Sequence, residues 1–403
     1  MTAIDAATTA QWQDRWRGSL MDNYGTPSMT LVRGRGARVW DAEGREYVDL
    51  LAGIAVNALG HAHPDVVASV AGQVATLGHT SNLALTPPAV ELAERLLALL
   101  DPAGTRDGRV FFCNSGAEAN EAAFKLTRRT GRTRVVVAER SFHGRTMGAL
   151  SLTGQPSKRD PFRPLLRGVT HIKYGDFKAL RKVNSRTAML ILEPIMGEAG
   201  VIVPPPGYLA AARAACDKAG AILALDCVQS GMGRTGTWFG YENEGIKPDL
   251  ITIAKGIGGG LPLGAMIALG RYSNALGVGS HGTTFGGNPI SCAAANAVIK
   301  EIDRLGIMAT NLAKGALLRR LIEPIRGIKE VRGRGLLLGI EFIEPRAKAV
   351  ASALLERGFI VNAANDATIR LAPSYLISEA QIKSFAASLK VGCNEVFTEV
   401  GHD

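Results

Sequence analysis

The sequence places a carboxylate and an amine at the ends of two short apolar runs. Residues 221–225 stop at Asp226, and residues 250–254 stop at Lys255. Short apolar runs bounded by glycine and aspartate are typical of buried strands in a parallel sheet, and such sheets bind ligands at the carboxyl ends of their strands. We therefore expect Asp226 and Lys255 to lie side by side at one edge of a sheet, although they are far apart in the chain.

This pair of side chains suits one chemistry in particular. A lysine amine forms a Schiff base with an aldehyde cofactor, and a carboxylate keeps a pyridine nitrogen protonated so that the ring can accept electrons. These are the groups with which a protein binds and activates pyridoxal phosphate. The alternative is two unrelated strand ends that each carry one surface charge. By themselves, the two residues favour that simpler interpretation.

Strand and helix patterns alternate from about residue 108 to residue 270, which predicts a largely parallel sheet with helices on both faces. One strand leads into Ser115-Gly-Ala-Glu118, which has the form of a capping box and opens an amphipathic helix. The free N–H groups and the dipole of such a helix start suit a phosphate, although an ordinary capped helix would look the same. After the next strand, Phe142 could stack on a planar ring and Arg145 could bind a carboxylate.

Composition bounds the class of protein. The chain has 403 residues, 46% hydrophobic and 20% charged, which predicts a soluble globular protein larger than one typical core. Its net charge of +10 is spread along the chain, so we expect no nucleic-acid partner. No apolar run is long enough to span a membrane, and no signal peptide is visible. The five cysteines are odd in number and lack CxxC spacing, which indicates reduced thiols in a cytoplasmic protein.

Two further patterns are weaker. His61 and His63 could be metal ligands, but we expect no third ligand nearby, and therefore structural histidines and no metal site. The run Gly231-x-Gly-x-x-Gly236 imitates a dinucleotide fingerprint, but a helix does not follow it, and we discount nucleotide binding. Arg370 falls inside an apolar strand pattern, where it must be paired or must await an anionic ligand.

Seven motifs then follow one another in the order typical of one enzyme family. They are NSGAEANEAAFK, SFHGRTMGALSLTG, LEPIMGEAG, DCVQSGMGRTG, AKGIGGGLPLGA, TTFGGNP and IRLAP. Beyond about residue 20, the chain resembles the class III (subgroup II) pyridoxal-phosphate-dependent aminotransferases of fold type I. The resemblance implies an α/β fold, with a mostly parallel sheet in a large domain and a smaller α+β domain built from both chain ends. We expect an N-terminal arm and part of the small domain in 1–60, the cofactor-binding domain in 61–280 and the C-terminal small domain in 281–403.

The resemblance also implies which residues bind the cofactor, pyridoxal 5'-phosphate. Lys255 would carry the Schiff base and Asp226 would hold the pyridinium nitrogen. The phosphate would be bound at the helix start, and the ring would lie between an aromatic side chain and the residues after Asp226. In a homodimer, a threonine would reach the phosphate bound to the other subunit. The remaining residues expected in these roles are Ser115, Gly116, Ala117, Phe142, Val228, Gln229 and Thr284.

For the substrate, the resemblance implies that Arg145 holds the α-carboxylate and that Asn57 also binds the substrate. Arg370 would bind 2-oxoglutarate, and Glu198 would pair with Arg370 while the amino donor is bound. The implied reaction, in arginine biosynthesis, converts N-acetyl-L-ornithine and 2-oxoglutarate to N-acetyl-L-glutamate 5-semialdehyde and glutamate.

Other substrates and classes remain open. Ornithine aminotransferases carry a tyrosine near residues 53–56 that is absent here, which favours an acylated diamine over ornithine or another ω-amino donor. Succinyldiaminopimelate is an alternative donor. Cys227, Ala117 and Ala84 depart from the family pattern, where glutamate, threonine and an aromatic residue are usual, so a pyridoxal-phosphate-binding protein without transaminase activity is a further alternative.

Overall fold

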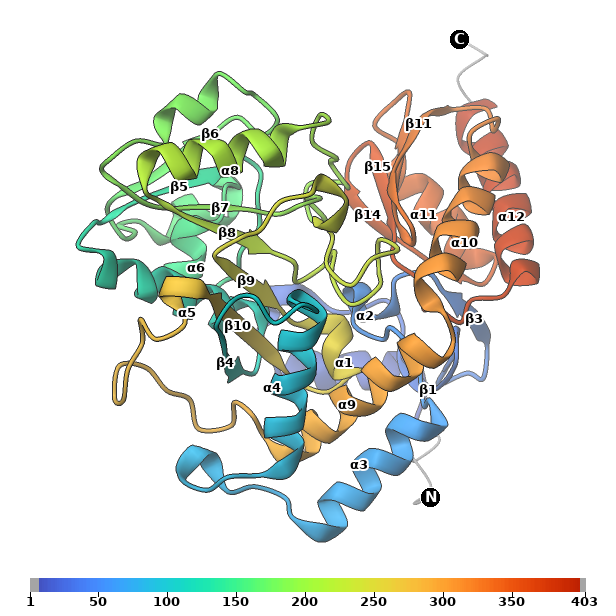
Figure 1. Ribbon diagram of the computed structural model, residues 1–403. Coiled ribbons are helices and arrows are strands. Elements are labelled where there is room, and N and C mark those ends of the chain that lie inside the picture. The colour runs from blue at the N-terminus through green and yellow to red at the C-terminus, as the bar shows by residue number, and fades with distance from the viewer. Residues whose placement is uncertain (1–6, 399–403) are drawn as a thin grey trace.

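The computed structural model describes residues 7–398, and a seven-stranded sheet lies at its centre (Figure 1). The strand order is β4-β10-β9-β8-β7-β5-β6. The strands are β4 Gly108–Cys113, β5 Arg134–Ala138, β6 Val169–Ile172, β7 Thr187–Leu192, β8 Ile222–Asp226, β9 Leu250–Ile253 and β10 Gly264–Leu269. Only β10 runs against its neighbours in this sheet, because it pairs antiparallel with both β9 and β4. The expected, largely parallel sheet is confirmed.

Helices cover both faces of this sheet. Since successive side chains of a strand point to opposite sides, each strand packs against helices on both faces. In β7, Leu190 and Leu192 belong to the main hydrophobic core, whereas Met189 and Ile191 belong to a second core that includes residues of α5. Figure 1 shows α8 on one side of the sheet and α5 on the other. The helices of this part are α3 Pro64–Thr76, α4 Pro87–Leu100, α5 Gly116–Leu126, α6 Met147–Leu152, α7 Pro156–Arg159, α8 Tyr208–Ala219 and α9 Pro289–Arg304.

Both ends of the chain contribute to a smaller α+β part. One sheet, in the order β11-β12-β15-β14, consists of β11 Ile328–Arg334, β12 Leu337–Phe342, β14 Asn362–Asn365 and β15 Thr368–Leu371. A second sheet consists of β1 Leu31–Arg35, β2 Arg38–Asp41, β3 Glu46–Asp49 and β13 Phe359–Ile360. In that sheet β13 pairs in parallel with β3, which joins the two chain ends as the resemblance implies. The domain boundaries at residues 60 and 280 stay predictions.

The remaining helices are α1 Thr9–Ser19, α2 Ala52–Ala55, α10 Ile307–Ile322, α11 Ala347–Glu356 and α12 Glu379–Thr398. Helices α10, α11 and α12 pack together beside the β11 sheet (Figure 1). Between residues 7 and 398, no helix is both long enough and apolar enough to cross a membrane.

Candidate active site

Asp226 and Lys255 line the same cavity, of about 420 Å³, at the carboxyl ends of β8 and β9. The chain turns at Lys255 into a 3-10 helix, Lys255–Gly258, and Lys255 itself has a positive φ of 53°. A non-glycine residue in that region is strained, and such strain is common at functional sites. Of the predicted site residues, the following line the cavity: Ser115, Gly116, Ala117, Phe142, Arg145, Glu198, Asp226, Val228, Gln229 and Lys255.

Three donors fix the Asp226 carboxylate. Oδ2 accepts a hydrogen bond from Nδ2 of Asn120 (2.8 Å) and lies 2.7 Å from Nδ1 of His143, while Oδ1 accepts from the Val228 N–H (3.1 Å). Because an ionised carboxylate only accepts, we assign the proton of His143 to Nδ1. Asn120 is oriented in turn by the hydroxyl of Thr252, which donates to its Oδ1 (2.8 Å). The buried carboxylate is thus held in one orientation at the end of its strand.

Lys255 is half-buried, and desolvation of its amine lowers the pKa of that amine to about 8. Glu198 opposes this change, and Arg370 adds to it. At pH 7, about a tenth of the amine is therefore uncharged and able to act as a nucleophile or a base, far more than for an ordinary lysine.

The start of α5 forms the third part of the cavity. Ser115 caps the helix by accepting from the Glu118 N–H (3.2 Å), but the second half of the expected capping box is wrong. Glu118 reaches one residue further back, where its Oε2 accepts from both the backbone N–H (2.8 Å) and the side-chain Nδ2 (3.0 Å) of Asn114. A Cβ atom on Gly116 would lie 2.8 Å from methyl groups of Val228, so glycine permits this close approach. The first N–H groups of a helix have no intrahelical acceptor and suit an anion.

Together, these groups fit pyridoxal phosphate. One cavity contains a partly neutral amine, a buried carboxylate and an anion-binding helix start. They match the aldehyde, the ring nitrogen and the phosphate of that cofactor.

Glu193, at the end of β7, ties two loops of the cavity together. Its Oε1 accepts from the Phe142 N–H (2.9 Å) and its Oε2 from the Gly197 N–H (3.2 Å). Burial raises the pKa of this carboxyl to about 7. The half-buried Phe142 also has the Lys158 ammonium 4.9 Å from its ring centroid.

Arg370 and Glu198 form an ion pair beside Lys255. Nη1 of Arg370 donates to Oε1 of Glu198 (2.5 Å) and to Oε1 of Gln229 (3.1 Å), while Nη2 donates to Oδ1 of Asn362 (3.0 Å). Burial alone would raise the pKa of Glu198, but the Arg370 guanidinium and the Lys255 ammonium hold it at about 2. Glu198 is therefore ionised at neutral pH.

The backbone on either side of Glu198 is fastened in place. The preceding residue, Gly197, is held by Glu193. The carbonyl of Ala199 accepts from Nη2 of Arg140 (3.0 Å) and from Nδ2 of Asn365 (3.3 Å). The Gly200 carbonyl accepts from both Nε and Nη2 of Arg332.

Three predicted residues do not line the cavity. Arg370 lies behind Glu198 and Gln229. The Asn57 side chain lies against Gly53 and Gly260, since Cβ atoms built there would meet it at 3.3 and 3.0 Å. Thr284 is exposed.

The sequence reasoning did not assign roles to Asn120, His143, Glu193 or Asn362. Glu193 directly follows β7, and His143 lies in the loop after β5, so both positions offered a signal. Asn120 and Asn362 lie inside a helix and a strand, and their contacts could not be inferred from spacing.

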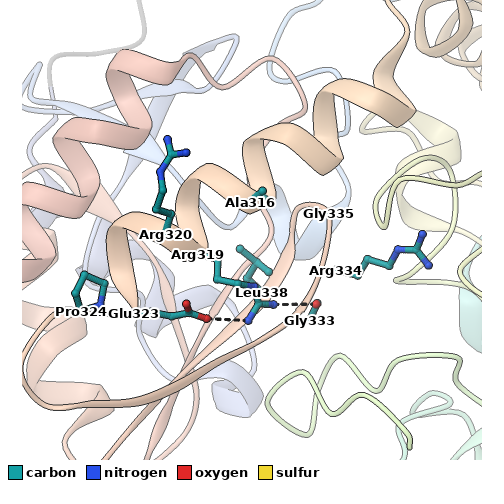
Figure 2. A pocket seen from close by; sticks show the side chains of 10 residues that line it. Ala316, Arg319, Arg320, Glu323, Pro324, Gly333, Arg334, Gly335 and Leu338 are labelled. Carbon is teal, nitrogen blue, oxygen red and sulfur yellow. Dashed lines mark hydrogen bonds and ion pairs between the residues drawn. The ribbon is translucent and has the colours of Figure 1, made fainter. Parts of the chain in front are cut away.

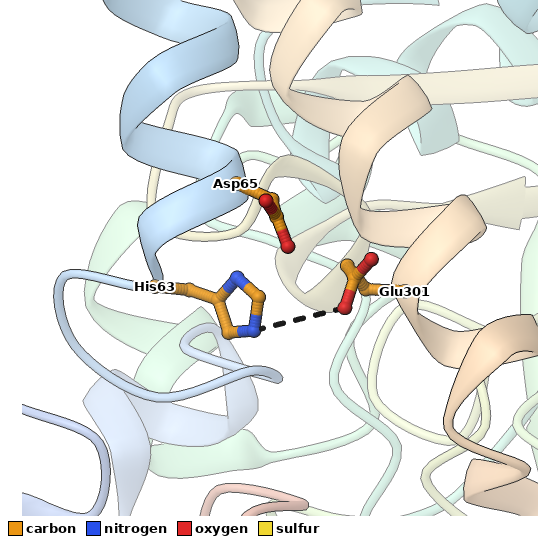
Figure 3. A group of neighbouring side chains, drawn as sticks. All are labelled: His63, Asp65 and Glu301. Carbon is orange, nitrogen blue, oxygen red and sulfur yellow. Dashed lines mark ion pairs between the residues drawn. The ribbon is translucent and has the colours of Figure 1, made fainter.

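His63 has acidic neighbours in space that the sequence did not indicate. Figure 3 shows His63 and Asp65, at the start of α3, facing Glu301 of α9; the ligand atoms of the three residues lie within 4.8 Å of one another. The expectation that no third ligand is nearby is therefore wrong. However, Arg304 binds both carboxylate oxygens of Glu301, at 2.6 to 3.1 Å. The group is thus a charge cluster between two helices.

A larger cavity, of about 770 Å³, lies between α10 and the turn joining β11 to β12 (Figure 2). Arg319 is occupied there by the Val331 and Gly333 carbonyls and by Glu323. Figure 2 shows Arg320 and Arg334 pointing in different directions. No set of charged groups converges in this cavity.

Comparison with known proteins places this geometry in a family. The model for aminotransferase class-III matches residues 20–391. The chain is 54% identical to acetylornithine aminotransferase of Mycobacterium tuberculosis, and the match covers 95% of this chain and 96% of that protein. It is also 54% identical to acetylornithine aminotransferase of Streptomyces coelicolor, with 93% of this chain and 94% of that protein covered.

Solved structures agree. An N-acetylornithine aminotransferase from Stenotrophomonas maltophilia K279a has a TM-score of 0.81 at 34% identity, with 94% of this chain and 99% of that chain covered. An ornithine aminotransferase from Toxoplasma gondii, with pyridoxal phosphate partially occupying its active site, has a TM-score of 0.91 at 29% identity. The match covers 97% of this chain and 96% of that chain.

Proposed function

We propose a specific reaction for this chain, which belongs to the class III aminotransferase family: it transfers the amino group of N-acetyl-L-ornithine to 2-oxoglutarate. The chain is a pyridoxal-phosphate-dependent aminotransferase. N-Acetyl-L-glutamate 5-semialdehyde and glutamate would be the products, in arginine biosynthesis. Relatives more than 50% identical over nearly the whole chain carry the name acetylornithine aminotransferase, and this supports the choice of donor.

The observation that carries the proposal is the ion pair between Arg370 and Glu198 beside Lys255. The donor brings one carboxylate and a neutral amide tail, whereas 2-oxoglutarate brings two carboxylates. A buried cation left opposite the neutral tail would be costly, so it needs a partner in the first half-reaction. Glu198 supplies that partner, and it can turn aside when a second carboxylate arrives.

Each residue of the cavity would have its own role in cofactor binding or proton transfer. Pyridoxal phosphate, when bound, accepts the amino group and returns it to the second substrate. Asp226 would hold the ring nitrogen protonated, supported by His143 and Asn120. Gly116 and Ala117 would bind the phosphate through their N–H groups, with Phe142 and Val228 on either side of the ring. Lys255 would move the proton of the substrate carbon that bears the amino group.

On the substrate side, Arg145 would hold the α-carboxylate at the cavity mouth. This exposed side chain lies 5.7 Å from the Phe142 ring centroid. Asn57 would contact the substrate from the segment beside Gly260.

A homodimer is part of the proposal. Leu83 and Leu85 are 96% and 91% exposed, and Phe285, beside Thr284, is 58% exposed. Their two segments lie together, since Asn82 donates to the Gly286 carbonyl (2.9 Å). Such an apolar patch favours a subunit contact, through which Thr284 would reach the partner's cofactor. We also propose a cytoplasmic location, which the five buried free thiols support.

A screen of amino donors tests the reaction. Purified protein with its cofactor is mixed with N-acetylornithine, succinyldiaminopimelate or ornithine, and the loss of cofactor absorbance is followed in single turnovers. We expect N-acetylornithine to give the highest second-order rate constant. A higher constant for either other donor would overturn the choice of substrate, and no turnover with any amine would overturn the transaminase itself.

A further inference from the structure

We propose that Asn362 is a specificity-determining residue that holds the Arg370 guanidinium in place when Glu198 turns away, and so sets how well the site accepts a dicarboxylate. The inference rests on the proposed exchange of Glu198 for a substrate carboxylate and deepens it.

The position of Asn362 suits a fixed anchor. It stands on β14, and its Cα atom lies opposite that of Arg370 on the neighbouring strand β15. Its Oδ1 accepts from Nη2 of Arg370 at 3.0 Å, whereas Glu198 binds Nη1. The contact therefore joins two paired strands, and Glu198 can leave without disturbing it.

Charge makes the type of residue at this position decisive. Arg370 is 2% exposed, and Glu198 is the carboxylate recorded against it among residues 7–398. When Glu198 turns away, the acceptors left are the amide oxygens of Asn362 and Gln229, and Nε is buried without a partner. Neutral amides orient a guanidinium but do not neutralise it. Arg370 then still requires an anion, which the second carboxylate of 2-oxoglutarate provides.

Asn362 is separable from the cofactor site, unlike Gln229. Gln229 lines the cavity with Asp226 and also donates weakly to Glu198 (3.5 Å), so its replacement would affect several functions. Asn362 is half-buried and is not among the residues that line the cavity. The one hydrogen bond recorded for its side chain among residues 7–398 is the bond with Arg370.

Two variants separate charge from hydrogen bonding. Asn362→Asp adds a permanent carboxylate next to Arg370, which then no longer requires one from the substrate. Asn362→Leu removes the hydrogen bond while keeping a similar shape. Asn184→Asp is the matched control, because it adds the same charge to a half-buried asparagine whose side chain, among residues 7–398, is recorded accepting one hydrogen bond, from the nearby Arg186 N–H.

The primary measurement is calorimetric binding of glutarate, an unreactive five-carbon dicarboxylate, to the protein with its cofactor bound. We expect Asn362→Asp to weaken glutarate binding by about 10- to 100-fold, Asn362→Leu by a few-fold, and Asn184→Asp not at all. The single-turnover rate with the best donor from the screen should stay within about twofold of the wild type in all three, since the donor half does not need a bare Arg370.

Unchanged glutarate binding in Asn362→Asp, or a loss of the donor single-turnover rate as large as the loss of glutarate affinity, would overturn the inference. If Asn362→Asp does not fold, Asn362→Leu is the test. Glutarate affinity equal to that of the wild type in Asn362→Leu would then overturn the inference. Glutarate binding does not depend on the amino donor. If the wild-type protein does not react with N-acetylornithine, the proposed substrate is refuted, but the role of Asn362 can still be tested by glutarate binding.

Discussion

Nδ1 of His143 lies 2.7 Å from Oδ2 of Asp226, and the other ring nitrogen of His143 is buried with no partner in the described chain. Asp226 therefore receives a donor whose proton is confined to one nitrogen. His143 contacts Asp226 directly, and we infer that it acts by positioning this carboxylate.

We predict that His143→Leu weakens cofactor retention by about 10- to 100-fold, because a hydrogen bond to a charged group contributes about 1.5–3 kcal/mol. Cofactor release during dialysis, followed by absorbance, measures this. His171→Leu is the control, since His171 contacts Arg159 and the Thr153 carbonyl but not Asp226. Equal release from both variants would refute the positioning role.

The lowered pKa of Lys255 predicts how the cofactor-free protein reacts. Attack on an aldehyde requires the neutral amine, and burial lowers the pKa of this amine to about 8. The rate at which added pyridoxal phosphate becomes covalently attached should fall about tenfold per pH unit below 8 and level off above it. Stopped-flow absorbance across pH 6–10 checks this. A midpoint near the ordinary lysine value of 10.5 would contradict it.

The Arg370–Glu198 pair predicts that one substitution separates the two half-reactions. Glu198→Gln removes the charge that neutralises Arg370 while the donor's neutral tail is bound. The half-reaction with N-acetylornithine should slow by about tenfold or more, and the half-reaction with 2-oxoglutarate should be unchanged or faster. Single-turnover rates of each half measure the effect. Equal slowing of both halves would exclude the exchange of partners.

The five thiols should be inert in the folded protein. All are buried, and burial raises the pKa of Cys113, Cys216, Cys292 and Cys393 to about 12 and that of Cys227 further. At pH 8, less than about 0.1% of each would be thiolate, the reactive form. A colorimetric disulfide reagent should label none of them in the native protein and all five after denaturation. Rapid labelling of native protein would contradict the burial of at least one thiol.

The sequence predicted the parts of the site that lie at strand ends. Asp226 and Lys255 were placed at one sheet edge because parallel strands present their carboxyl ends together, and they share a cavity. Spacing could not show that β10 is reversed, because a short apolar run has the same pattern in either direction. It also could not show that Asn362 faces Arg370, since that contact depends on the register between β14 and β15.

The anchored backbone around Glu198 has a consequence for the speed of the enzyme. Gly197, Ala199 and Gly200 are all held by side chains, so the carboxylate can leave Arg370 by rotation about its own side-chain bonds. Side-chain rotations take picoseconds to nanoseconds where there is room, whereas lids and domains open over microseconds to milliseconds. We therefore expect the change from one substrate to the other to be nearly instantaneous on the scale of turnover, so that viscosity slows product departure but not the exchange of partners at Arg370.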